Sequence, residues 1–178
     1  VVQAPQAHRI GSTRGFERMM KWETEGFFWI GMHHRHTRNA IIQHGTMTLV
    51  RAADLQQLRW NEDCLCEDTE LGLRLLKAGR HAVYVDRVLG AGRVPGDFEA
   101  YARQRKRWAQ GGMQILKQHA RSLLGRSSLT LAQRYHYLAG WLPWLGDALH
   151  LQREGDVAQN RQMRQEREML EDHAHPVA

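Results

Sequence analysis

Cysteine is scarce in this sequence, which has only Cys64 and Cys66 among its 178 residues. A single residue separates the two thiols, so a disulfide between them would be badly strained. No spacing of Cys with Cys or with His suggests a zinc site. The sequence therefore predicts two reduced thiols, as in a cytosolic compartment.

Long apolar runs are also absent. No segment is apolar over the length that crosses a bilayer, and the chain shows neither an initiator Met nor a signal-peptide pattern. Because the chain opens on the strand-like residues Val1 and Val2, we expect it to be a piece of a longer protein, cut at its start.

Charge is present but unbalanced, with 25 Lys and Arg against 19 Asp and Glu and a net charge of +6. The hydrophobic fraction of 42% and the charged fraction of 25% are those of a globular protein, long enough for one domain with a modest core. A positive balance favours anionic partners, which include nucleic acid, acidic lipid and phosphorylated small molecules, without choosing among them.

Strand and helix patterns alternate along most of the chain. Strands are predicted at 1–5, 46–51 and 81–86, helices at 12–28, 52–58, 67–78 and 97–118, and polar or Gly-rich loops at 33–39 and 87–96. Gly79 is placed to end one helix, and Asp97 is placed to cap the start of another. This alternation predicts an α/β sheet covered by helices.

A different pattern follows near the C-terminal end. Six apolar residues recur at helical spacing: Leu131, Tyr135, Leu138, Leu142, Leu145 and Leu149. Trp141 and Trp144 flank this stripe, and Pro143 should bend the helix. Aromatic residues beside an aliphatic stripe suit a helix in a membrane interface, although a helix docked on the domain explains the pattern as well. Residues 150–178 are almost wholly polar and predict a solvated helix or a disordered tail.

Two acidic residues, Glu67 and Asp68, open the helix predicted at 67–78. A helix N-terminus stabilises carboxylates, so the pair has a purely structural explanation. The functional interpretation is that one carboxylate projects into a cleft as a general base, kept ionised by the helix dipole.

Gln104, Arg107 and Trp108 share one face of the helix predicted at 97–118, because they stand at i, i+3 and i+4. Arg107 can hold a phosphate or carboxylate with two hydrogen bonds, and Trp108 offers a flat face to a ring. The structural alternative is a buried Trp among solvated arginines. An apolar stripe is expected to anchor the helix from behind: Phe98, Ala102, Ala109, Gly112, Ile115 and Leu116.

Two weaker clusters complete the candidates. The run Gln-His-Gly-Thr at 43–46 contains a glycine that permits close approach of a ligand to the backbone, although a turn explains it equally. The histidines within 33–36 are of a type that binds metal, but no fixed carboxylate or Cys partner accompanies them. They predict a solvated loop.

The order of these motifs is specific. An acidic pair opening a helix is followed by a strand, a Gly-rich loop and, about forty residues later, a helix with Gln-x-x-Arg-Trp. This combination resembles the processive, membrane-embedded family 2 glycosyltransferases, among them cellulose synthase, hyaluronan synthase and the bacterial β-glucan synthases. Their Thr-Glu-Asp and Gln-x-x-Arg-Trp motifs stand here at 66–68 and 104–108, and the likeness extends over 1–6, 39–51 and 141–149.

The resemblance implies a GT-A fold and an inverting, single-displacement transfer from a nucleotide sugar. Asp68 would be the base that deprotonates the acceptor hydroxyl, with Glu67 supporting it. His44, Gly45 and Thr46 match the place of a Gly-containing loop near the acceptor in that family.

The same resemblance gives roles to the helix that carries Gln-x-x-Arg-Trp. Gln104 and Arg107 would face the leaving diphosphate, where Arg107 would offset the charge that grows as the bond breaks. Trp108 would stack under the acceptor sugar, an arrangement that tolerates a polymer moving one unit at a time.

Three departures from the family pattern shape the expected architecture. Cys66 replaces the usual Thr, and a polar sequence follows residue 149 where the family continues into a transmembrane span. No Asp-x-Asp occurs, the motif with which the family holds the Mg²⁺ or Mn²⁺ that bridges the diphosphate. We therefore expect an α/β, partial GT-A domain that lacks its nucleotide-binding half and has no metal ligand of its own. The acceptor-side half would cover 1–126, the interface helix 127–149 and the polar tail 150–178.

The expected function is that of a fragment of a membrane polysaccharide synthase, inactive in isolation. The full-length protein would lie in a bacterial inner membrane with its catalytic domain on the cytoplasmic face, anchored by the interface helix and by transmembrane segments outside this chain. It would transfer a hexose, glucose from the donor UDP-glucose, to a growing β-glucan.

Two alternatives belong to other classes. A basic nucleic-acid-binding module would use the cationic run at 103–107, although an acidic helix start and a Trp-rich interface helix interrupt the basic residues. A non-catalytic remnant of a glycosyltransferase is the other. Nucleic-acid affinity falls steeply with salt, whereas binding of an acceptor sugar barely changes, so a salt titration separates the first alternative.

Overall fold

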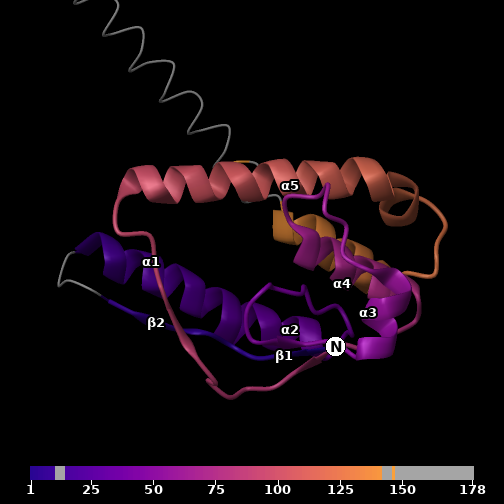
Figure 1. Cartoon of the computed structure of the whole chain (residues 1–178), viewed down its shortest axis with the longest axis horizontal. Coiled ribbons are helices and arrows are strands. Elements are labelled where there is room, and N and C mark those ends of the chain that lie inside the picture. The colour runs from indigo at the N-terminus through magenta and orange to yellow at the C-terminus, as the bar shows by residue number, and fades with distance from the viewer. Residues whose placement is uncertain (11–14, 142–145, 147–178) are drawn as a thin grey trace, which may run out of the picture.

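Short strands and long helices alternate in the computed structural model, which describes residues 1–10, 15–141 and 146. The strands are β1 (Val2–Gln3), β2 (Ala7–Arg9), β3 (Thr48–Leu49), β4 (Val83–Tyr84) and β5 (Ala91–Arg93). The helices are α1 (Gly15–Gly26), the π-helix η1 (Phe27–Met32), α2 (His33–His36), α3 (Ala52–Leu58), α4 (Glu67–Lys77) and α5 (Phe98–Leu124), and residues 131–141 are also helical. In Figure 1, α5 runs along one side of the molecule and β1 and β2 along the opposite side. The expected mixture of strands and helices is present.

The larger sheet is built around β1, in the order β3-β1-β4. β1 pairs antiparallel with β3, with Val2 opposite Leu49, and parallel with β4. A second sheet joins β2 and β5 in parallel, with Ala7 opposite Ala91. The prediction of an uninterrupted loop over 87–96 is therefore wrong, because the pairing that makes β5 a strand comes from a distant part of the chain.

The first helical region is longer than the sequence pattern predicts. A helix over 12–28 was expected to give way to a polar loop, but helical structure continues through η1 and α2 to His36. His33 Nε2 lies 3.2 Å from a carboxylate oxygen of Asp86, and the backbone N–H of Tyr84 donates to Nδ1 of His36 at 3.1 Å. The loop prediction is wrong for α2. Its helical conformation is accompanied by contacts from His36 to β4 and from His33 to Asp86, which follows β4.

The predicted end of α4 at Gly79 and the predicted start of α5 at Asp97 are both confirmed. Gly79 has a φ of 73° after α4, and its N–H donates to the carbonyl of Leu76 at 2.9 Å. At the start of α5, the side chain of Asp97 accepts a hydrogen bond from the N–H of Ala100 at 2.7 Å. α5 itself is longer than expected and ends at Leu124.

The buried face of α5 differs from the predicted stripe, because Arg105, Gly111 and Leu123 are also buried. Ala109, Gly112 and Ile115 are buried as expected, whereas Phe98 is 58% exposed. Arg105, which the predicted stripe does not include, is buried. A guanidinium therefore occupies the interior where the pattern predicted only apolar side chains.

The hydrophobic core joins η1, the segment after α2, α4, α5 and the helix at 131–141. Its buried members are Phe28, Met32, Ile41, Ile42, Cys64, Cys66, Leu73, Leu76, Ala82, Tyr84, Ile115, Leu123, Leu129, Tyr137 and Trp141. Both cysteines are free thiols, as the sequence predicted.

The helix at 131–141 docks on this core through Tyr137, Trp141 and one residue of the predicted stripe, Leu138. Tyr137 and Trp141 are buried, whereas Leu131 is 80% exposed and Tyr135 is 64% exposed. The docked alternative therefore holds for these residues, and part of the apolar stripe faces outward. The positions expected at 142, 143, 145 and 149, and the tail from 150, lie outside the described residues. Within the part that is described, no helix is both long and apolar enough to cross a membrane.

Candidate active site

The carboxylate of Asp68 lies at the start of α4, against the loop that contains Gly45. Asp68 Oδ1 accepts the backbone N–H of Thr69 at 2.7 Å, and the backbone of Gly45 lies beside the same carboxylate. A Cβ atom placed on Gly45 would lie 3.2 Å from Asp68 Oδ2, a spacing tighter than most real contacts. The absence of a side chain therefore permits the loop to approach the acid this closely.

Burial raises the pKa of Asp68 above 3.8, and the negative charge of Glu67 acts in the same direction. The hydrogen bonds from Thr69 and Gly45 oppose the rise without cancelling it. The sequence predicted an acid that the helix dipole keeps ionised, and the largest cause of the pKa shift, desolvation, acts against ionisation. A carboxylate with a raised pKa is a stronger base wherever it is still ionised.

The acceptor-loop candidates His44, Gly45 and Thr46 are held by Gln3, a buried residue that sequence reasoning missed. Gln3 Nε2 donates to the carbonyl of Thr46 at 2.9 Å, and Gln3 Oε1 accepts the backbone N–H of His44 at 2.9 Å. The hydroxyl of Thr69 on α4 donates to the carbonyl of residue 43 at 3.1 Å. The sequence feature that could have revealed the role of Gln3 is its amide side chain in an otherwise apolar strand.

The ring of His44 forms an apolar contact rather than a polar one. It meets the edges of Phe27 and Phe28, with ring centroids 4.7 and 5.5 Å away. Burial, together with the nearby charge of Arg35, lowers the pKa of His44 to about 4. The imidazole is therefore neutral near pH 7.

A close contact between helices brings the acidic pair beside the Gln-x-x-Arg-Trp segment. A Cβ atom on Gly111 of α5 would lie only 3.0 Å from the backbone nitrogen of Cys66 and 2.8 Å from its Cβ. Cys66 Sγ also lies 3.9 Å from the carbonyl oxygen of Trp108. Burial raises the pKa of the Cys66 thiol to about 12, and the charge of Arg107 opposes that rise. The sequence motifs at 66–68 and 104–108 are therefore neighbours in space.

The residues proposed on α5 differ in exposure. Arg107 is exposed, whereas Gln104 and Trp108 are partly buried. Arg105, to which the sequence gave no individual role, is buried, and its guanidinium carbon lies 4.8 Å from the ring centre of Trp108. The signal that could have found it is its position three residues before the tryptophan.

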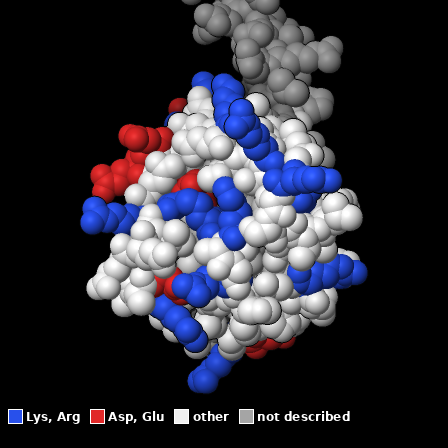
Figure 2. Space-filling view, turned by 90° about the vertical axis from the view of Figure 1, so that its right-hand side faces the viewer, with Lys and Arg blue, Asp and Glu red and all other residues white. Residues whose placement is uncertain are grey.

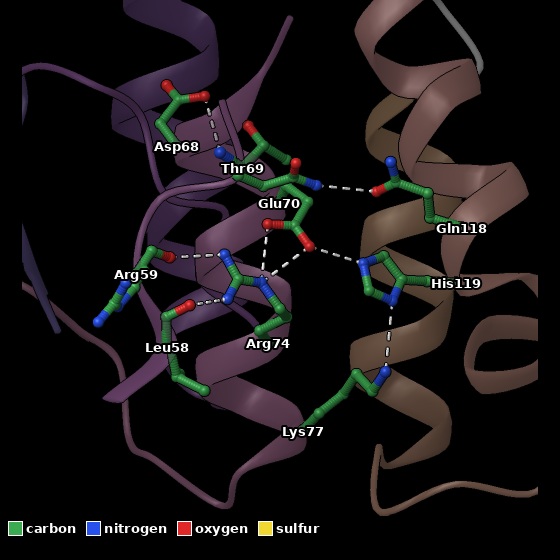
Figure 3. Close-up of polar contacts among 10 residues, drawn as sticks. Leu58, Arg59, Asp68, Thr69, Glu70, Arg74, Lys77, Gln118 and His119 are labelled. Atoms are coloured by element: carbon green, nitrogen blue, oxygen red, sulfur yellow. Dashed lines mark hydrogen bonds and ion pairs between the residues drawn. The ribbon is translucent and has the colours of Figure 1, made fainter. Parts of the chain in front are cut away.

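A buried polar network joins α4 to α5 below this site (Figure 3). The carboxylate of Glu70 is hydrogen-bonded by Arg74 Nε at 2.8 Å and lies 2.8 Å from His119 Nε2. His119 Nδ1 lies 3.3 Å from the ammonium of Lys77, and the guanidinium of Arg74 also donates to the carbonyls of residues 58 and 59. The network holds α4 in place relative to α5.

Within the described ranges, no three His, Cys, Asp or Glu side chains are grouped so that they could hold an ion. The side chains that the structure brings together here include a carboxylate, a guanidinium and an indole.

Comparison with known proteins identifies the family of this chain. The model of the family described as "Glycosyl transferase family group 2" matches residues 2–152. The chain belongs to this glycosyltransferase family. The match includes all the candidate residues on α4, on α5 and in the loop at 43–46.

Three relatives of this glycosyltransferase chain are informative. It is 27% identical over 96 residues to "Probable glucomannan 4-beta-mannosyltransferase 14" of Arabidopsis thaliana, covering 53% of this chain and 18% of the relative. It is 28% identical over 79 residues to "Probable glucomannan 4-beta-mannosyltransferase 7" of Oryza sativa subsp. japonica, covering 44% and 14%. It is 30% identical over 73 residues to "Probable glycosyltransferase YdaM" of Bacillus subtilis (strain 168), covering 40% and 17%. The matched stretch is thus less than a fifth of each relative.

Proposed function

We propose that this chain forms the acceptor-facing part of a GT-A catalytic domain in an inverting polysaccharide synthase, with Asp68 as the general base. The observation that carries the proposal is the approach of the Gly45 backbone to the Asp68 carboxylate. The packing of Gly111 against Cys66 supports it, because this packing brings α5 beside the same acid.

In the proposed reaction, an acceptor hydroxyl gives its proton to the carboxylate of Asp68 as its oxygen attacks C1 of the donor sugar. The bond from C1 to the diphosphate oxygen breaks, and the electron pair leaves with the diphosphate. Attack from the face opposite the leaving group inverts the configuration at C1. A base with a raised pKa suits this proton transfer, provided that it is ionised at the working pH.

Further residues receive supporting roles in the proposal. Arg107 and Gln104 face the departing diphosphate, where a guanidinium stabilises the developing charge. Trp108 stacks against the acceptor sugar, and Glu67 supports Asp68. Because the sequence has no Asp-x-Asp motif, we assign the Mg²⁺ or Mn²⁺ of the family to ligands outside this chain and derive no step through it.

The donor is the least constrained part of the proposal. The sequence resemblance favours glucose from UDP-glucose and a β-glucan acceptor, whereas two relatives are named as glucomannan mannosyltransferases. We retain glucose as the first candidate and mannose as the second. Parallel assays with nucleotide-activated glucose and mannose separate the two.

Membrane association is also part of the proposal. Leu131 and Tyr135 are exposed on a helix that is otherwise docked on the core, as expected of residues at a lipid interface. We place the full-length protein at the cytoplasmic face of a bacterial inner membrane. Flotation of the full-length protein with vesicles, before and after the change of both residues to Ser, tests this assignment.

The decisive experiment uses Asp68→Asn in the full-length protein. Transfer of labelled sugar should fall by about 10²-fold or more, because the amide cannot accept the proton. Asp63→Asn is the matched control, since Asp63 is an exposed acid just before α4. Equal activity of the Asp68 variant and the wild type would refute the proposed base, and the isolated chain is expected to form no polymer.

A basic nucleic-acid-binding module is the second candidate, favoured by the net charge of +6 and by the interleaving of basic and aromatic residues around 103–107. Figure 2 shows Lys and Arg on one face in several groups separated by uncharged side chains. A nucleic-acid groove needs a more continuous basic track than this face shows. Tight binding of an oligonucleotide that weakens steeply between low and physiological salt would favour this candidate over the glycosyltransferase. A full-length protein that folds but transfers no sugar would instead be the non-catalytic remnant.

A further inference from the structure

The guanidinium of Arg105 lies between two aromatic rings inside the molecule. Its carbon is 4.8 Å from the ring centre of Tyr101 and 4.8 Å from that of Trp108. Arg105 Nη2 also donates to a carboxylate oxygen of Glu23 on α1 at 2.7 Å. The Arg105 residue is only 6% exposed, so these contacts define its surroundings.

We propose that Arg105 is a positioning residue for Trp108 and, through it, sets the affinity of the site for the acceptor sugar. This inference rests on the proposed function, in which the Trp108 indole stacks against that sugar. A planar guanidinium can lie over an aromatic face and pair with a carboxylate at the same time, whereas an ammonium group cannot reproduce this geometry. The orientation of the Trp108 indole then depends on its contact with the Arg105 guanidinium and on the ion pair between Arg105 and Glu23.

The burial of this arginine supports a positioning role over a purely stabilising one. Desolvating a charged pair costs about as much as the pair gains, so such a pair is weak evidence for stability. Arg105 Nε is buried and has no hydrogen-bond partner within the described part of the chain. The arrangement therefore leaves one donor unsatisfied while it keeps the guanidinium beside both rings.

The same contact connects the two sides of the proposed acceptor site. Glu23 belongs to α1, which continues directly into η1. η1 carries Phe27 and Phe28, whose rings contact His44 of the acceptor loop. A single helical region thus touches both the loop and the arginine that packs on Trp108.

The test compares kinetic constants of the full-length protein with Arg105→Lys, Arg105→Met and Glu23→Gln. We expect KM for a soluble oligosaccharide acceptor to rise about tenfold in both arginine variants, and less in the milder glutamine variant. KM for the nucleotide sugar should stay within about twofold of the wild type. Lys106→Met is the matched control, because Lys106 is an exposed cation next to Arg105 on the same helix.

The outcomes distinguish a positioning role of Arg105 from a role of its charge alone and from a role in core stability. An Arg105→Lys variant with the wild-type acceptor KM would overturn the proposal, since charge alone would then suffice. A uniform loss of stability, kcat and both affinities would also overturn it, because that is the effect of damage to the core. Glu23→Gln, which alters a partly exposed partner, keeps the proposal testable if the arginine variants fail to fold. Loss of the Trp108 side chain without any effect on acceptor KM would instead refute the proposed function itself.

Discussion

His119 on α5 lies with its Nε2 atom 2.8 Å from the carboxylate of Glu70 on α4, at the point where α5 departs from helical geometry. His119 has φ −114° and ψ 15° within an otherwise helical segment. The same carboxylate is bonded by Arg74, whose guanidinium also reaches the carbonyls at the end of α3 (Figure 3). Glu70 therefore connects three segments around the helix that carries Asp68.

Glu70→Ala should strongly destabilise the chain. Glu70 is 2% exposed, so its loss leaves the partly buried Arg74 and His119 without their carboxylate partner. Breaking a buried pair from one side costs about 3 kcal/mol or more. Urea unfolding should show this loss, whereas Glu62→Ala, at an exposed acid, should change the free energy of unfolding by less than about 0.5 kcal/mol.

The same network should make the stability of the folded chain decrease at low pH. Burial opposes ionisation of Glu70, but hydrogen bonds from His119 and Arg74 outweigh it and hold the pKa of Glu70 below 4.5. Its stabilising contribution is therefore present above pH 4.5 and is lost as the pH falls through the lower folded-state pKa. Glu70→Gln should flatten this loss in thermal unfolding curves below pH 4.5, and an unchanged slope would contradict the assignment.

His44 should add a separate pH dependence at milder acidity. Its pKa is about 4 in the folded chain, against 6.5 for an unperturbed imidazole. Between these values the unfolded state binds more protons, so stability should decrease as the pH falls from 6.5 to 4 and be level above that window. The difference in Tm between wild type and His44→Gln should change across this window alone. A constant difference would mean that the ring is not desolvated by Phe27 and Phe28.

Much of the fold could be predicted where local residues determine it. The start of α5 follows from Asp97, and the end of α4 follows from Gly79, because caps depend on neighbours a few residues away. The candidate acid and the Trp-bearing helix were likewise found from sequence, and the structure brings their helices together through Gly111.

The parts that could not be predicted depend on distant partners. β2 is a strand only because it pairs with β5, and neither segment has a strong pattern of its own. Arg105 was read as part of a cationic surface, since nothing near it in sequence reveals that Glu23 supplies its carboxylate. Gln3 acquires its role from the loop at 43–46, which reaches it only in the folded chain.

Gly111→Ala should weaken the packing of α5 against Cys66 at the start of α4. The added methyl group would lie 3.0 Å from the backbone nitrogen of Cys66, and backbone atoms cannot move aside as a flexible side chain can. We expect a loss of about 1–3 kcal/mol in the free energy of unfolding. Gly26→Ala is the control, because nothing lies within 4 Å of its Cβ position and its φ is helical. The control should match or slightly exceed wild-type stability, and equal stability of the two variants would contradict the close packing.

Gly45→Ala should impair sugar transfer while leaving the fold nearly intact. Its methyl group would lie 3.2 Å from Asp68 Oδ2, so either the loop or the carboxylate must shift by a few tenths of an ångström. Gly45 is exposed and has no positive φ, so the substitution itself should cost little stability. Small displacements of a proposed base reduce the rate steeply, and we expect at least a tenfold fall, about 1.4 kcal/mol, in kcat/KM of the full-length protein. Gly26→Ala again serves as the control, and wild-type transfer by Gly45→Ala would show that the loop's approach to Asp68 is not part of the reacting geometry.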